Sequence, residues 1–190
     1  MKLFTTFSVF VFIAFYNLLN AAQPLNLDLI FRKGLFYSYA YSDLRSMNNG
    51  KHYTVLENST EIIKYDYETG DEREVLFSCN VMESDELPFV TEYNLSENEN
   101  IILLNGNKER LYRYSFYSDF YTYDIKNKKL NPVFNEKKRR LASVSTDGKK
   151  ITFVVDNNLF LKDIANQVIT QITSDGYPNC IINGAPDWVY

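Results

Sequence analysis

The stretch "LASVSTDGKKITFVVDNNLFLKDIANQVITQIT" (Leu141–Thr173) decides the fold of this chain. It consists of short runs rich in Val, Ile, Leu and Phe, which are separated by polar residues dominated by Asn, Asp and Gly. Short β-branched and aromatic runs with such interruptions are typical of antiparallel strands joined by hairpin turns. The stretch therefore predicts one unit of four antiparallel strands.

The beginning of this unit occurs three times in the chain. A polar turn followed by an apolar run is found in "SMNNGKHYTVL" (Ser46–Leu56), "LSENENIILL" (Leu95–Leu104) and "VSTDGKKITFV" (Val144–Val154). The first and third turns, at Asn49-Gly50 and Asp147-Gly148, are 98 positions apart (147 − 49), and the middle copy lies near halfway. The period is therefore about 49 residues.

Each copy continues in the same way. A second strand ends in an aromatic or charged residue followed by Asp, and a third short apolar strand closes the unit after another turn. The second strands and their turns are Ile62–Gly70, Phe120–Leu130 and Leu159–Val168. Three units are thus expected at roughly 41–80, 88–135 and 139–175.

Four antiparallel strands in every 40 to 50 residues are typical of a β-propeller blade. The 15 Tyr and 14 Phe fit this fold, because flat blades pack face to face through large side chains. We therefore predict an all-β fold, a partial β-propeller of about three to four four-stranded antiparallel blades of a larger ring. A sandwich of irregular hairpins is the alternative. The next turn of the repeat would fall near position 197, so we expect the chain to stop inside a repeat.

Residues 1–22 differ from the rest of the chain. Lys2 is followed by an apolar run from Leu3 to Tyr16, and Asn20-Ala21-Ala22 offers small residues for cleavage. This layout predicts a signal peptide at 1–22, with retention as an uncleaved membrane anchor as the alternative. We expect an exported protein, periplasmic or secreted, whose residues 23–190 form the partial propeller domain.

Without the leader, the chain carries 19 Lys and Arg (20 − 1) against 24 Asp and Glu, a net charge of −5. Such a surface repels phosphate backbones, so nucleic acid is not an expected partner. The basic run Lys137–Arg140 is expected to be a solvated connection. Cys79 and Cys180 are compatible with export, but two cysteines make no disulfide framework, and their pairing is left open.

The sequence contains none of the common catalytic or metal-binding motifs considered below. The seven glycines form no Gly-x-Ser-x-Gly motif, and the only histidine, His52, is expected on a strand surface. Zinc would need several Cys or His at short spacing. "DYETGDERE" (Asp66–Glu74) lacks the Gly and Glu positions of an EF-hand loop, so it is expected to be a hairpin turn. We therefore assign no catalytic, cofactor or metal residue.

The stretch "LYRYSFYSDFYTYD" (Leu111–Asp124) is longer and more aromatic than its counterparts in the other two copies. It holds Arg113 and directly follows Arg110. Insertions in repeats generally form loops on one face, where binding occurs. An arginine among tyrosines can direct its donors at a carbonyl or carboxylate. A surface or interblade ion pair is the alternative role for these arginines.

Four stretches together resemble the N-terminal part of dipeptidyl peptidase IV, of the bacterial secreted type within the prolyl oligopeptidase family of serine peptidases. They are "LRSMNNGKHYTVL", "RYSFYSDFYTYDI", "DNNLFLKD" and "NGAPDWVY". The similarity runs in order from about Leu27 to Tyr190, and its most specific landmarks are Asp187–Tyr190 and the Arg-x-Ser-aromatic run at Arg113.

The resemblance implies an eight-bladed propeller followed by a C-terminal α/β-hydrolase domain, in an exopeptidase that releases Xaa-Pro or Xaa-Ala dipeptides. It implies that Arg113 contacts a backbone carbonyl of the peptide substrate, while the glutamates that bind the substrate's amino group would come directly after Tyr190. We expect the chain to lack the catalytic domain and to be inactive alone. Tyr114 stands where other members have histidine, and this change has no interpretation.

Two functions follow from these expectations. The preferred one is the truncated propeller part of a dipeptidyl peptidase IV-like enzyme, in which the propeller gates and anchors the substrate. The resemblance leaves room for a homodimer of the full-length protein and requires no cofactor. The alternative is a stand-alone exported, non-catalytic binding protein of propeller type.

Overall fold

The structure is a computed structural model that describes residues 26–34, 36, 43–81, 87–111, 113, 115–135 and 139–186. The chain divides into two compact units, Met1–Ala40 and Tyr41–Tyr190. In the first unit, Asp28–Arg32 forms a π-helical turn. Among the described residues, no helix has the length and hydropathy needed to cross a membrane. The predicted signal peptide and the boundary that follows it lie outside the described residues.

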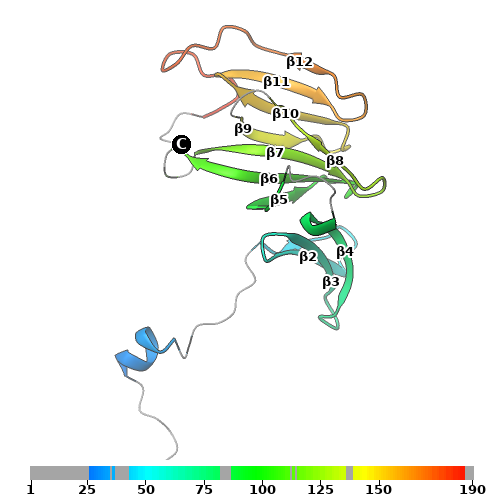
Figure 1. Cartoon of the computed structure of the whole chain (residues 1–190), viewed down its shortest axis with the longest axis vertical. Coiled ribbons are helices and arrows are strands. Elements are labelled where there is room, and N and C mark those ends of the chain that lie inside the picture. Colours follow the sequence, from blue (N-terminus) through cyan, green and yellow to red (C-terminus); the bar gives the residue numbers. More distant parts are fainter. Residues whose placement is uncertain are drawn as a thin grey trace, which may run out of the picture. The chain divides into compact units, whose positions relative to one another are not determined.

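The second unit contains three four-stranded antiparallel sheets, each made of four strands that are consecutive in the sequence (Figure 1). Blade 1 comprises β1 (Arg45–Ser46), β2 (His52–Glu57), β3 (Glu61–Asp66) and β4 (Glu72–Ser78). Blade 2 comprises β5 (Glu92–Leu95), β6 (Ile101–Arg110), β7 (Phe116–Asp124) and β8 (Lys129–Pro132). Blade 3 comprises β9 (Arg140–Val144), β10 (Lys150–Val155), β11 (Asn158–Asp163) and β12 (Ile169–Gln171).

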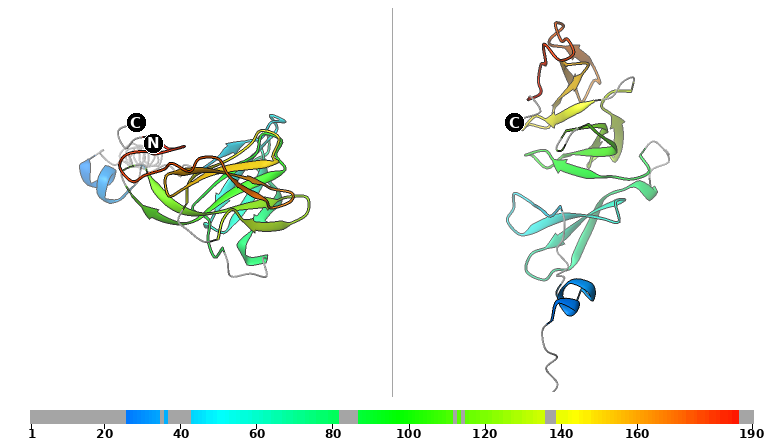
Figure 2. Two further views of the ribbon diagram at one scale, coloured as in Figure 1. Left: turned by 90° about the horizontal axis from the view of Figure 1, so that it is seen from above. Right: turned by 90° about the vertical axis from the view of Figure 1, so that its left-hand side faces the viewer.

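The strands of each blade pair in chain order, and the three blades lie side by side in the same order (Figures 1 and 2). The strands fall inside the three predicted units. This arrangement confirms the predicted partial propeller with four-stranded blades, and it excludes the alternative of two packed sheets of irregular hairpins.

The first turn of each blade is built in the same way and recurs at an interval of 49 residues, at Asn49, Asn98 and Asp147. In each turn the side-chain Oδ1 of this residue accepts a hydrogen bond from the backbone N–H two residues later, at 2.8, 3.2 and 3.1 Å respectively. The residue after Asn49 is Gly50, with φ of 64°, and the residue after Asp147 is Gly148, with φ of 68°. Glycine adopts this left-handed conformation without the penalty that a Cβ brings.

These turns also connect one blade to the next. The Asn48 side-chain amide donates to the Glu97 carbonyl at 2.5 Å, which joins blade 1 to blade 2. The Asn98 side-chain amide donates to the Asp147 carbonyl at 2.6 Å, which joins blade 2 to blade 3. The repeated polar turns therefore do more than reverse the chain, because they also hold successive blades in register.

The interior between blades 1 and 2 is a cluster of large apolar side chains. It includes Ile62 and Phe77 from blade 1 and Ile102, Leu104 and Tyr123 from blade 2. The rings of Phe77 and Tyr123 meet edge to face, with centroids 4.9 Å apart. Leu87 and Val90, from the connection between the blades, complete this cluster.

A second cluster fills the space between blades 2 and 3. Leu103 and Phe120 come from blade 2, whereas Ile151, Phe153 and Val155 come from β10 of blade 3. Strand β6 thus sends Ile102 and Leu104 to one interface and Leu103 to the other, as the alternation of side chains along a strand requires. Because both faces of β6 are covered, this part of the strand is the most enclosed in the unit.

Blade 3 also carries apolar side chains that stay exposed. Val168, Ile172 and Tyr177 expose 56%, 52% and 66% of their surface. Val168 directly precedes and Ile172 directly follows the last strand, β12, which pairs with β11 and forms the end of its sheet, and Tyr177 comes six residues after that strand. We call these three exposed apolar residues the blade 3 apolar flank.

Candidate functional site

The hairpin β6–β7 is longer than the equivalent hairpins of the other blades. Its strands have ten and nine residues, whereas β2, β3, β10 and β11 have six each. The first six residues of β6 are buried and its last four are exposed, so the hairpin extends beyond the packed core. The predicted extension in blade 2 is confirmed, but it is formed by lengthened strands as well as by the connection between them.

Arg113 lies in the connection at the end of this hairpin. The backbone N–H of Leu111 donates to the Ser115 carbonyl at 2.9 Å and closes the connection. Arg113 is exposed, and its carbonyl accepts a hydrogen bond from the Arg110 guanidinium at 3.4 Å. Both predicted arginines therefore lie at the tip of the hairpin. The contact of Arg113 with substrate stays a prediction, and Tyr114 lies outside the described residues.

A β-bulge between Asn105 and Lys108 marks the point where β6 leaves the core. The Thr91 hydroxyl lies 3.1 Å from both the Asn105 and the Gly106 carbonyl oxygens, and the Ser118 hydroxyl lies 3.4 Å from the Gly106 carbonyl. A Cβ on Gly106 would come within 2.9 Å of Leu87 Cδ1. The absence of a Cβ at position 106 therefore allows the Leu87 side chain to approach the bulge closely.

Two ion pairs flank the bulge. The first joins Lys108 Nζ to Glu92 Oε2 at 2.6 Å, and it ties the exposed half of β6 to β5. The Lys108 ammonium also lies 4.3 Å from the centre of the Phe116 ring, across the hairpin. Both charged side chains are about one-third exposed, so this pair contributes modestly to stability.

The second ion pair centres on Asp119 in β7, and its arginine is buried whereas the Asp119 side chain is about one-third exposed. One carboxylate oxygen accepts from the Arg139 guanidinium at 2.5 Å, and the other accepts from the Asn107 side-chain amide at 3.1 Å. The Arg139 carbonyl in turn accepts the Ser118 backbone N–H at 3.0 Å. Asp119, Asn107 and Arg139, called here the Asp119 clamp, connect both strands of the hairpin to the beginning of blade 3.

The position of Arg139 corrects the interpretation of the basic run Lys137–Arg140. The prediction of a solvated connection is wrong for Arg139, because this residue is only 7% exposed and is paired with Asp119. Lys137 and Lys138 lie outside the described residues. The sequence analysis did not predict this clamp. The one signal for it is Asp119, an acidic residue inside the aromatic strand Phe116–Asp124, which indicates a nearby partner.

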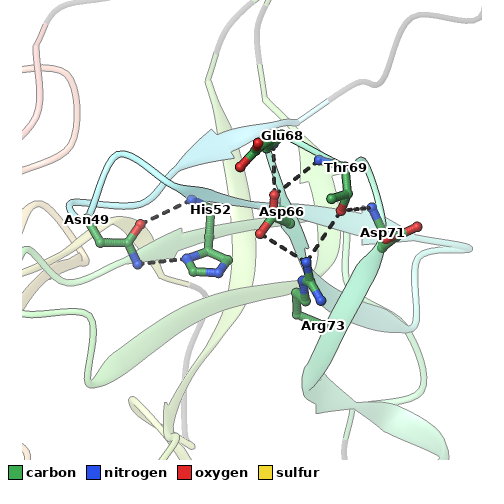
Figure 3. A network of polar contacts seen from close by, with 7 residues as sticks. All are labelled: Asn49, His52, Asp66, Glu68, Thr69, Asp71 and Arg73. Carbon is green, nitrogen blue, oxygen red and sulfur yellow. Dashed lines mark hydrogen bonds and ion pairs between the residues drawn. The ribbon is translucent and has the colours of Figure 1, made fainter.

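The predictions for blade 1 are confirmed where the structure describes them (Figure 3). His52 is the first residue of β2, and its Nδ1 lies 3.0 Å from the Asn49 side-chain amide. Asp66 begins a hairpin turn in which it accepts the backbone N–H groups of Glu68 and Thr69, and it pairs with Arg73 at 3.2 Å. The Thr69 and Glu68 N–H bonds lower the pKa of the Asp66 carboxyl.

This acidic turn is held together by its own donors. No group of three or more His, Cys, Asp or Glu suited to a metal ion occurs among the described residues. Cys79 and Cys180 are both free thiols, so the structure does not join them. Of the features described here, the exposed arginine at the tip of a braced hairpin is the one suited to binding a ligand, because a guanidinium directs fixed donors at a carbonyl or carboxylate.

Comparison with known proteins identifies similar sequences and structures. Residues 96–190, from blade 2 onward, match the family model of the dipeptidyl peptidase IV N-terminal region. The human protein named prolyl endopeptidase FAP is 33% identical over 144 residues, which are 75% of this chain and 18% of that protein. The mouse protein of the same name is 34% identical over 131 residues, covering 68% of this chain and 17% of that protein.

Among solved structures, dipeptidyl peptidase 4 of Porphyromonas gingivalis is similar with a TM-score of 0.75 and 33% identity. The match covers 88% of this chain and 24% of that structure. The chain therefore spans about a sixth to a quarter of the length of these relatives. Asp187–Tyr190, the other predicted landmark, lies outside the described residues. The match of half of the chain to the family model shows that the chain belongs to the family of dipeptidyl peptidase IV N-terminal regions.

Proposed function

We propose that this chain is the N-terminal propeller region of a serine exopeptidase that releases Xaa-Pro and Xaa-Ala dipeptides from the N-termini of polypeptides. The catalytic serine, aspartate and histidine would belong to an α/β-hydrolase domain beyond residue 190. The propeller would gate access to that domain and anchor the substrate. We further propose that the protein is exported, with residues 1–22 as its signal peptide or membrane anchor, and that the full-length enzyme forms a homodimer.

One observation carries this proposal. The family match covers the hairpin that holds Arg113, and in the structure this arginine lies exposed at the tip of the longest hairpin of the described blades. A guanidinium in this place can donate to the backbone carbonyl of a bound peptide. A charged hydrogen bond of this kind contributes about 1.5–3 kcal/mol.

The test is the substitution Arg113→Ala in the complete protein, encoded together with the sequence that follows Tyr190. With a Gly-Pro or Ala-Pro chromogenic substrate, kcat/KM is expected to fall by about ten- to a hundredfold, because the lost bond helps to hold the peptide in the transition state. The matched control is Arg73→Ala in blade 1, which removes the same charge from the exposed beginning of β4 and is expected to leave kcat/KM within about twofold of the wild type.

A small phosphonylating reagent should still react with the catalytic serine of the Arg113→Ala variant, because the arginine takes no part in bond making. Unchanged kcat/KM in a normally folded variant would return Arg113 to a structural role. A coding sequence without the adjacent glutamates and a Gly-x-Ser-x-Gly serine after Tyr190 would contradict the proposed peptidase.

A further inference from the structure

We propose that the Asp119 clamp positions Arg113, so that Asp119 and Arg139 are positioning residues for substrate binding although neither lies at the tip of the hairpin. This inference rests on the proposed function of Arg113. It adds two residues from outside the connection Leu111–Ser115, one of them contributed by the segment that enters blade 3.

The clamp lies at the base of the exposed half of the hairpin. The exposed half of the hairpin starts at the bulge between Asn105 and Lys108, and Asn107 and Asp119 lie on its two strands at this point. Their side chains meet at 3.1 Å across the hairpin. The clamp therefore acts where the direction of the exposed half is set.

Arg139 is buried. Its side chain is 8% exposed, and its Nε is buried without a hydrogen-bond partner. A guanidinium in this environment needs a nearby anion, because burial of an unpaired charge is costly. Asp119 supplies that anion, so the Asp119 carboxylate has little freedom to move away from Arg139.

The base of the hairpin is also bonded to the beginning of blade 3. The Ser118 N–H donates to the Arg139 carbonyl, so the backbone of β7 is bonded to the segment that starts the next blade. Side-chain and backbone contacts thus fix β7 against blade 3 at the base of the hairpin. On the other strand, the Lys108–Glu92 pair fixes β6 against β5. Both strands of the hairpin are anchored before they reach Arg113.

The experiment compares Asp119→Asn, Arg113→Ala and the double variant in the complete protein. Asp119→Asn keeps the shape of the side chain and removes its charge. It is expected to lower kcat/KM about five- to tenfold in the wild-type background, but less than twofold once Arg113 is alanine, because the clamp then has no arginine to position. The matched control is Asp66→Asn, which removes the charge from the exposed Asp66–Arg73 pair in blade 1 and is expected to change kcat/KM less than twofold.

A second comparison separates positioning from stability. The double variant Asp119→Asn/Arg139→Met removes the buried unpaired guanidinium, so its melting temperature is expected to recover towards that of the wild type. Its kcat/KM is expected to stay low, because the clamp is still absent. Recovery of both quantities together would overturn the proposal and give the pair a purely structural role.

Hydrogen exchange supplies a readout that does not depend on activity. In Asp119→Asn, amides of residues 107–111 and 115–118 are expected to exchange about tenfold faster, while those of Ile102–Leu104 stay as slow as in the wild type. Unchanged exchange in the hairpin overturns the clamp whatever the activity shows. If Arg113→Ala has no effect on kcat/KM, the proposed function fails, and fast exchange confined to the hairpin still supports the clamp.

Discussion

The hydroxyl of Tyr93 in blade 2 lies 2.8 Å from the hydroxyl of Thr54 in blade 1, and both residues are fully buried. The Tyr93 hydroxyl also lies 3.1 Å from the Asp43 carbonyl oxygen, and the Thr54 hydroxyl lies 3.5 Å from the Arg45 carbonyl oxygen. A buried phenol needs such partners, because an unsatisfied polar group inside the protein is costly. This pair is therefore a polar contact inside the otherwise apolar interface between blades 1 and 2.

The ionisation of Tyr93 predicts a loss of stability at alkaline pH. Burial raises the pKa of Tyr93 to about 12, whereas the unfolded chain releases this proton near pH 10. The stabilising contribution is complete below pH 10 and disappears as the pH rises through 12, because the unfolded state is favoured by losing the proton first. Between pH 9.5 and 11.5 the free energy of unfolding should fall by about 2 kcal/mol from this group.

Urea denaturation of the wild type and of Tyr93→Phe at these two pH values measures that contribution. The variant should be less stable than the wild type at pH 9.5, and it should lose about 2 kcal/mol less on going to pH 11.5. Tyr67→Phe, at an exposed tyrosine of blade 1, is the control and should follow the wild type. Parallel losses in the wild type and Tyr93→Phe would show that another group is responsible.

The turn at Gly148 predicts a measurable contribution from the contact between successive turns. Gly50 and Gly148 share nearly the same positive φ, but a Cβ would meet open space at Gly50 and would lie 2.9 Å from the Asn98 side chain at Gly148. Gly50→Ala therefore reports only the strained backbone, a cost of about 1 kcal/mol. Gly148→Ala should cost about 1 kcal/mol more, because Asn98 must also give up its bond to the Asp147 carbonyl.

Thermal or urea denaturation of the two variants gives this difference directly. Adding Asn98→Ala provides the check, since Gly148→Ala should then cost no more than Gly50→Ala. Equal effects of both glycine substitutions in the wild-type background would mean that the Asn98–Asp147 bond contributes nothing to stability.

The blade 3 apolar flank predicts self-association when residues 23–190 are produced alone. Exposed apolar side chains next to a strand at the end of a sheet favour pairing with another chain. Sedimentation velocity should show species larger than a monomer that grow with concentration. Replacing Val168 and Ile172 by lysine should reduce them, whereas Lys in place of the exposed Leu27 should have little effect. A monomer with one cooperative melting transition would contradict this expectation.

The repeated part of the fold is predictable from sequence because its signals are local. Asn49, Asn98 and Asp147 form their turns with backbone groups only two residues away, and the apolar runs after them specify strands by composition alone. The position of Arg139 is different. Its burial depends on Asp119, twenty residues earlier in the chain. The two residues meet only because β8 and the segment after it run back along β7. Local composition described the run Lys137–Arg140 as solvated and had no means of detecting this partner.

In the candidate site, too, the features set by local sequence were predictable, whereas those set by contacts with distant segments were not. The sequence indicated that blade 2 has an extension and that Arg113 lies in it. It did not indicate the close approach of Leu87, from the connection between the blades, to Gly106 in the bulge. Contacts between distant segments form only when the blades pack together, so they cannot be predicted from the spacing of residues along the chain.

The hairpin that carries Arg113 projects from the core as an arm that begins at the bulge. Four exposed residues of β6 follow the buried part, which at about 3.3 Å per residue is an arm of roughly 13 Å. A tilt of only about 10° at the bulge would therefore displace the tip by about 2 Å, and a misplacement of about 1 Å can lower the rate of an enzyme about a hundredfold. If Arg113 holds a peptide end as proposed, the accuracy of that contact would be determined at the base of the arm, where β6 is enclosed by two neighbouring blades.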